Sequence, residues 1–138
     1  NKEIKNVDSN LIYLAGIRLI EKLKFIGNVN ELIKYTILTL ELYPDNLSLM
    51  NQLGIGYMLL GKFKLAKQQF ERVFYFDEKD PIAMCHYAFI LKQHELKINE
   101  SIDLFKECLL SKDENVMDGR FFYHLGDALQ RNERNEEV

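Results

Sequence analysis

The sequence has few of the features typical of disulfide-rich domains, disordered chains and membrane-spanning helices. Its 138 residues include two cysteines, two prolines and no tryptophan. Two cysteines without a CxxC spacing exclude a disulfide framework or a zinc ribbon as the basis of the fold, and scarce proline excludes a proline-rich disordered chain. Apolar runs such as Met58-Leu59-Leu60 fall far short of the roughly 18 residues that a membrane helix needs. We therefore expect no membrane insertion by this segment.

Charge and length narrow the class of protein further. The chain has 18 Lys and Arg against 21 Asp and Glu, a net charge of −3, which gives no reason to expect a nucleic-acid surface. A chain of this length can bury a core of its own, so we expect one domain over residues 1–138. Residue 1 is Asn rather than Met, and we expect the chain to be a piece of a longer protein.

The sequence repeats with a period of 34 residues, the length of the tetratricopeptide unit. The residues that recur at this step are Gly27 and Gly61, and Leu19, Leu53 and Tyr87. A fourth unit follows after a slip of four residues, at Leu125-Gly126. We place the units at about 13–46, 47–80, 81–118 and a half unit at 119–138.

The second unit resembles the tetratricopeptide family most clearly. It carries Leu53-Gly54, Tyr57, Ala66 and Phe70 in the family's order. Small residues at Gly54 and Ala66 would let two helices approach closely, with the rings filling the space between them. The predicted fold is all-α, a right-handed superhelix of antiparallel helix pairs with about seven helices, at 10–25, 29–42, 46–60, 63–76, 81–93, 98–110 and 117–131. An unrelated helical bundle is the alternative.

Residues with catalytic or metal-binding chemistry are sparse. His124 and Asp127 lie three apart on one predicted helix and supply at most two metal ligands, fewer than an iron or zinc site needs. We expect Cys108 in the core and Cys85 on the groove face, neither in the cationic surroundings of a reactive thiolate. The prediction is a non-enzymatic chain with no catalytic residue, metal or cofactor of its own. A metalloenzyme built on His124 and Asp127 is a further hypothesis.

The predicted binding surface is the inner wall of the superhelix, to which each unit contributes its first helix. The candidate substrate-binding residues at its polar end are Phe89, Lys92, Arg120, Tyr123, Asp127, Gln130 and Arg131. Further inward positions are Ile17, Glu21, Asn51, Ile55 and Met58. An aromatic ring beside Arg, Asp and Gln suits a peptide or loop with mixed hydrogen-bonding groups. A solvated helix face is the alternative for each residue taken singly.

Chaperone-binding tetratricopeptide domains hold a C-terminal carboxylate with Lys, Asn and Arg, and that role is disfavoured here. The matching positions are Ile17, Glu21, Gln52, Ile82 and His86. The carboxylate of Glu21 would repel the carboxylate of such a ligand.

Four segments resemble one tetratricopeptide-containing family, the aspartyl/asparaginyl β-hydroxylases. Asp118–Arg131 is similar to the last tetratricopeptide helix of that family, and Tyr43–Leu49, Leu53–Gly61 and His86–Lys92 fit it as well. The resemblance covers about residues 40–131. Residues 132–137 lack the glycine turn that the resemblance would lead us to expect next.

The resemblance implies a function that composition does not. In that family a non-catalytic tetratricopeptide region packs on a C-terminal oxygenase domain that uses Fe(II) and 2-oxoglutarate, and EGF-like substrates lie between the two. It therefore implies EGF-like domains and the oxygenase domain as partners, and the lumen of the endoplasmic reticulum as the location. The sequons at Asn46 and Asn99 suit that location. A stand-alone scaffold for protein–protein interaction is the alternative function.

Overall fold

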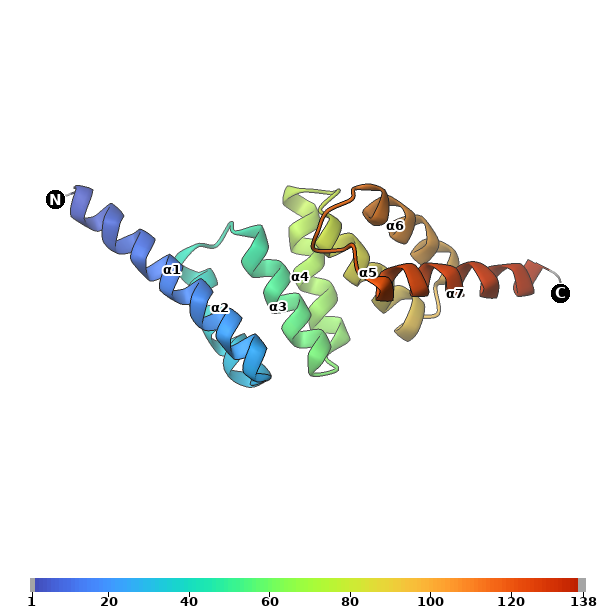
Figure 1. Ribbon diagram of the computed structural model, residues 1–138, viewed down its shortest axis with the longest axis horizontal. Coiled ribbons are helices and arrows are strands. Elements are labelled where there is room, and N and C mark those ends of the chain that lie inside the picture. The colour runs from blue at the N-terminus through green and yellow to red at the C-terminus, as the bar shows by residue number, and fades with distance from the viewer. Residues whose placement is uncertain (1, 137–138) are drawn as a thin grey trace.

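Seven α-helices follow one another along the part of the chain that the structure describes. The computed structural model describes the backbone of residues 2–136 and the side chains of residues 9–133. The helices are α1 Lys2–Ile26, α2 Val29–Leu42, α3 Leu47–Leu59, α4 Phe63–Phe76, α5 Pro81–His94, α6 Ile98–Leu110 and α7 Gly119–Glu136. They stack in chain order into an elongated array, with the two termini at opposite ends (Figure 1). The all-α prediction is confirmed.

The helix boundaries follow the local sequence signals closely inside the chain and less closely at its ends. The side-chain oxygens of Asn28, Asn46 and Asp80 accept the backbone N–H three residues later and cap α2, α3 and α5. Pro81 then occupies the first turn of α5, where its missing N–H costs nothing. By contrast α1 begins at Lys2 rather than at residue 10, and α7 continues to Glu136 rather than ending at residue 131. Both corrected segments are polar, so no apolar periodicity marked them.

Consecutive helices pack as antiparallel pairs through the small residues of the repeat. A methyl group added to Gly54 would lie 2.7 Å from two ring carbons of Phe70, so α3 and α4 touch where only glycine fits. Ala66 and Phe70 are fully buried in the same contact. Gly27 and Gly61, 34 residues apart, turn α1 into α2 and α3 into α4 with φ of 84° and 75°. The repeat that the sequence predicts is therefore a repeat of structure.

The core has two adjacent parts. The first lies among α1 to α5 around Leu32, Leu49, Phe70 and Val73. The second lies among α5, α6 and the start of α7, around Phe105, and it includes Val116 and Phe121. No helix in the described part of the chain combines the length and the apolar character needed to cross a bilayer.

The two cysteines form a disulfide that joins α5 to α6. Cys85 and Cys108 are both fully buried, and their Cα atoms lie 5.7 Å apart. The expectation that Cys108 lies in the core is confirmed. The placement of Cys85 on the groove face is wrong, because its side chain points from α5 into the second part of the core. Two cysteines are too few for a disulfide framework, and the sequence alone did not predict that they pair with each other.

Candidate functional site

A pocket opens between α3, α5 and α7, the first helices of three successive units. Its volume is about 550 Å³, and α3, α5 and α7 supply most of its wall. The apolar part of the wall consists of Ile55, Met58, Leu59, Phe63, Ile82, Phe89 and Phe121. The polar part consists of Lys24, Ser48, Asn51, Gln52, His86, His94, Asn115, Asp118, Arg120 and His124.

Three polar side chains of the pocket are fixed by bonds to the scaffold. The Asn51 side-chain nitrogen donates to Asp80 Oδ1 at 3.0 Å, and the same oxygen caps α5. Nδ1 of His86 lies 2.6 Å from the carbonyl oxygen of Ile82, and because a carbonyl only accepts, Nδ1 carries the proton. Arg120 binds both carboxylate oxygens of Asp118 through Nε and Nη2, at 2.8–3.2 Å. These bonds orient the side chains before any ligand arrives.

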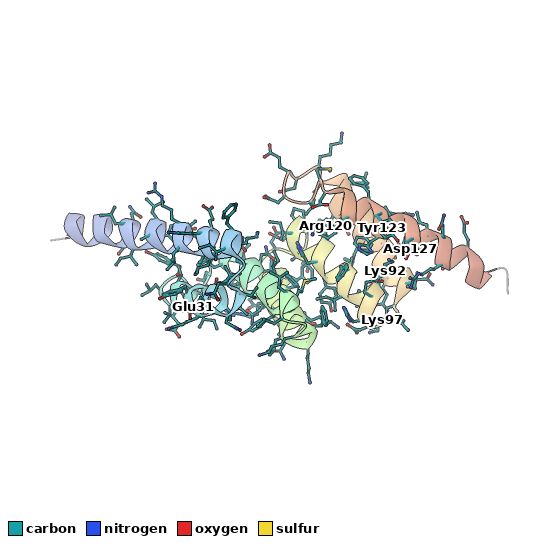
Figure 2. All side chains as sticks on the ribbon, turned by 60° about the horizontal axis from the view of Figure 1, so that its bottom comes forward. Glu31, Lys92, Lys97, Arg120, Tyr123 and Asp127 are labelled. Carbon is teal, nitrogen blue, oxygen red and sulfur yellow. A yellow bond between two sulfur atoms is a disulfide. The ribbon has the colours of Figure 1, made fainter. Side chains whose placement is uncertain are left out.

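A buried lysine ties α5 to α7 behind the pocket. Lys92 is 1% exposed, and its ammonium lies 2.8 Å from Asp127 Oδ2 and 2.9 Å from His124 Nδ1. Arg131 completes the cluster, with Nε 3.0 Å from the same Asp127 oxygen. Figure 2 labels Lys92, Asp127 and Tyr123 where the two helices meet. Since an ammonium group only donates, His124 Nδ1 accepts and its Nε2 carries the proton.

The surroundings lower the pKa of the Asp127 carboxyl and of two imidazoles, each for a different reason. The hydrogen bond from Lys92 holds the pKa of Asp127 below its usual value, so its carboxylate is charged. Burial lowers the pKa of His124, and the Lys92 ammonium lowers it further. Burial likewise lowers the pKa of His86. The site therefore combines a fixed ion pair with two neutral imidazoles at neutral pH.

The predicted binding residues occupy three different settings. Phe89 and Arg120 line the pocket. Tyr123, Gln130 and Arg131 are exposed on α7 but are not among the residues that line it. Lys92 and Asp127 bond to each other where α5 and α7 pack. The face of α7 that turns toward the pocket carries Arg120, Phe121 and His124.

The ion pair between Lys92 and Asp127 was not predicted from the sequence. The Lys92–Asp127 ion pair joins residues 35 apart, close to the repeat length, and that spacing was the available signal. The hypothesis that His124 and Asp127 hold a metal ion is disfavoured, because the positive ammonium of Lys92 is bonded to both side chains. The side chains from residue 9 to residue 133 contain no group of three or more His, Cys, Asp or Glu residues arranged to hold a metal ion.

Solved structures identify the fold. The tetratricopeptide domain of Sgt2 from Aspergillus fumigatus superposes with a TM-score of 0.74 at 12% identity, over 95% of this chain and 83% of that one. The P58(IPK) tetratricopeptide domain gives a TM-score of 0.77 at 18% identity, over 90% of this chain and 34% of that one. The Yersinia enterocolitica secretion chaperone SycD, solved with a peptide of the translocator YopD, gives 0.72 at 16% identity, over 89% and 93%. At these identities the likeness shows the fold alone.

Sequence comparison adds a more specific likeness. The mouse aspartyl/asparaginyl beta-hydroxylase is 38% identical over 129 residues, which cover 94% of this chain and 17% of that protein. The human protein is 38% identical over 128 residues, again 17% of its length. The chain thus spans about a sixth of the length of these relatives, and no family model matches it. The chain has the tetratricopeptide fold and is similar, over nearly its whole length, to one segment of aspartyl/asparaginyl β-hydroxylase.

Proposed function

We propose that the chain is the non-catalytic tetratricopeptide segment of an aspartyl/asparaginyl β-hydroxylase. In this proposal it binds EGF-like protein substrates and packs on a C-terminal oxygenase domain, which supplies Fe(II) and 2-oxoglutarate chemistry that this segment does not. The observation that carries the proposal is the 38% identity over 94% of the chain, because the match extends through the pocket helices and α7.

The exposed side of α7 suits contact with a folded protein substrate. Tyr123 is 67% exposed, and its ring lies edge-on to the His124 ring, with 5.3 Å between the ring centroids. Arg120, Gln130 and Arg131 are also exposed and offer hydrogen-bond donors for carbonyl and carboxylate groups. Tyrosine and arginine are enriched among the residues that contribute most of the binding energy at protein interfaces.

A second face of α7 suits packing against a further helical or domain surface. In α3, Gly54 packs against Phe70 of α4, and Met50, one turn earlier in the same helix, is buried as well. The equivalent positions in α7 are Gly126 and Phe122. A methyl group added to Gly126 would meet nothing within 4 Å, and Phe122 is 51% exposed. The repeat geometry thus leaves a glycine-centred apolar face open on α7, which supports the proposed contact with the oxygenase domain.

Two features support a location in the lumen of the endoplasmic reticulum. The Cys85–Cys108 disulfide suits an oxidising compartment. Of the two sequons, Asn99 is exposed in the first turn of α6, whereas the Asn46 amide caps α3 and donates to Tyr13 Oη at 3.1 Å. We propose Asn99 as the sequon open to a glycan.

The proposal is tested by calorimetry of the chain with a purified EGF-like domain that carries a hydroxylatable Asp or Asn. Tyr123→Ala and Arg131→Ala should each weaken binding several-fold, since both remove contact groups from the exposed side of α7. Tyr75→Ala and Arg72→Ala on the outer helix α4 are the matched controls and should leave binding unchanged. Equal affinity for all five proteins would contradict the proposed substrate surface.

A stand-alone scaffold for peptide binding is the second candidate function. The pre-oriented pocket favours it, as does the likeness to SycD, which was solved with a bound peptide. Reading the coding sequence downstream of Val138 separates the two candidates. An oxygenase domain there supports the first function, and a stop codon there supports the second.

A further inference from the structure

The helix α1 carries apolar side chains on the side that faces away from the core. Its core-facing residues are Tyr13, Ile17, Ile20 and Leu23. On the opposite side Leu11, Leu14 and Phe25 are 59%, 51% and 92% exposed. Among the described helices only α2 packs against α1, which lies at the N-terminal end of the array (Figure 1). Terminal units of a solenoid usually present a polar outer face, so an apolar one indicates a contact that the single chain does not supply.

The exposed apolar residues of α1 follow a heptad spacing. Leu11, Leu14 and Phe25 take positions a, d and a of a seven-residue repeat. Arg18 and Glu21, which are exposed as well, take the a and d positions between Leu14 and Phe25. In a helix with roughly 3.6 residues per turn, these five residues form one narrow stripe along the axis. A stripe of a and d positions is the surface by which one helix packs against another in a coiled coil.

The two charged residues of the stripe determine which helix fits it. Among the side chains of residues 9–133, neither Arg18 nor Glu21 has an ion-pair partner. A fitting helix must place a carboxylate opposite Arg18 and a cation opposite Glu21. A second copy of α1 that runs antiparallel does both, because its Glu21 then faces Arg18 and its Arg18 faces Glu21. A parallel copy in register would oppose two arginines and two glutamates instead, and like charges repel.

The same antiparallel register also matches the apolar residues. Leu14 precedes Arg18 by four residues and Phe25 follows Glu21 by four, so Leu14 of one copy lies opposite Phe25 of the other. Lys22, which flanks the stripe, lies nearest to Ala15 of the other copy, so no two lysines meet across the contact. Every pair occurs twice, because the two copies are related by a two-fold axis. The stripe is therefore complementary to itself in both charge and apolar character.

We propose that α1 forms an antiparallel coiled-coil contact with α1 of a second copy of this chain. Leu14 packs against Phe25 of the other copy, Arg18 pairs with Glu21 of the other copy, and Leu11 lies at the edge of the contact. A contact of about two heptads is at the small end of specific interfaces, so the dimer forms reversibly at micromolar concentrations of the chain. This inference is independent of the proposed function, because α7 lies at the other end of the array (Figure 1).

The direct test is sedimentation equilibrium of the chain over about 5–500 µM, which should show a reversible monomer–dimer equilibrium. Arg18→Glu and Glu21→Arg should each weaken dimerisation about tenfold, because like charges then meet at two places. An equimolar mixture of the two variants should dimerise as the unaltered chain does, since each mixed pair again joins opposite charges. Arg72→Glu, at an exposed position on α4, is the matched control and should dimerise normally. A chain that stays monomeric, or charge variants that dimerise normally by themselves, would overturn the proposal.

Disulfide cross-linking tests the orientation of the two helices. The native cysteines are paired with each other, so an introduced cysteine can react without competition from them. A mixture of the Leu14→Cys and Phe25→Cys chains under mild oxidation should give mainly the mixed cross-linked dimer. The Tyr75→Cys chain, altered at an 84% exposed position on α4, is the control and should cross-link to neither. Cross-linking of each α1 variant mainly to itself, or as much cross-linking of the Tyr75→Cys chain, would overturn the antiparallel contact.

Discussion

Single residues in equivalent repeat positions experience very different packing, and the glycines show this most clearly. Gly54 and Gly126 occupy the same position of the repeat, the residue after a leucine in the first helix of a unit. At Gly54 an added methyl group would lie 2.7 Å from the Phe70 ring, whereas at Gly126 it would meet nothing within 4 Å. The same substitution therefore has opposite expected effects at the two positions.

Gly54→Ala should lower the free energy of unfolding by about 1–3 kcal/mol, because Phe70 is fully buried and cannot move aside without strain. Gly126→Ala should leave it unchanged or raise it by up to about 1 kcal/mol, since alanine is the better helix former. Urea unfolding followed by circular dichroism measures both. Equal destabilisation by the two substitutions would mean that α3 and α7 do not occupy the same repeat phase.

The turn of the third unit replaces a repeat glycine with a strained leucine. Gly27 and Gly61 have positive φ, and in the third unit Leu96 takes that conformation with φ of 55°. A left-handed conformation costs a non-glycine residue roughly 1–2 kcal/mol. Leu96 is 71% exposed, so its side chain contributes little packing in return.

Leu96→Gly should therefore raise the free energy of unfolding by about 0.5–1 kcal/mol, the part of that strain that remains after glycine's greater freedom in the unfolded chain. Thermal unfolding of the variant measures the change. Lys106→Gly, at an exposed position inside α6, is the control and should be destabilising. A lower melting temperature for Leu96→Gly would contradict the strain at this turn.

At the scale of helices, the sequence predicts most of the fold because each element carries a local signal. The Asp80-Pro81 pair places the start of α5, and Gly61 places the turn before α4, both as found. The face that a helix turns inward depends instead on how it tilts against its neighbours. In α7 the residue turned to the pocket is His124 rather than Tyr123. Periodicity within one helix contains no signal for that choice between neighbouring residues.

The disulfide is the strongest link between two elements of the third unit. Cys85 and Cys108 close a loop across α5 and α6 at a sequence separation of 23. For a loop of that length, the loss of chain entropy in the unfolded state corresponds to about 3 kcal/mol in the entropic account of disulfides. The bond also fixes the helix that carries Phe89 and Lys92, so α5 should keep its register against α7 best in the oxidised chain.

Reduction should accordingly lower the free energy of unfolding by about 2–4 kcal/mol. The measurement is denaturant unfolding with and without a phosphine reductant, with mass spectrometry of the alkylated chain to count free thiols. The Cys85→Ala, Cys108→Ala double variant should be as unstable as the reduced chain and insensitive to the reductant. Finding two free thiols in the non-reduced folded chain would contradict the pairing.

At the scale of the whole molecule, the response to pH reflects where the titratable groups lie. Ion pairs hold the pKa of Glu95 and of Asp127 below their usual values, through Lys67 and Lys92 respectively. Burial lowers the pKa of His86 and of His124 instead. The histidines therefore prefer the neutral form in the folded state, while the carboxylates prefer the charged form. These preferences determine two separate steps on acidification.

Stability should be constant through neutral pH and then fall in two stages. Below the ordinary histidine pKa of 6.5 the unfolded chain takes up protons that folded His86 and His124 resist, so unfolding becomes easier as pH drops through that value. The second decrease in stability begins below about pH 4.5, the ordinary pKa of Glu95. It becomes larger as the pH falls through the lowered pKa values of Glu95 and Asp127, because protonation breaks the ion pairs of both carboxylates. Urea midpoints at constant ionic strength between pH 8 and pH 2 follow both stages. His124→Gln keeps an acceptor for Lys92 but cannot gain a proton, so its midpoint should drop less between pH 7 and pH 5. An unaltered chain with the same midpoint at pH 7 and pH 5 would show that neither imidazole is held neutral by the fold.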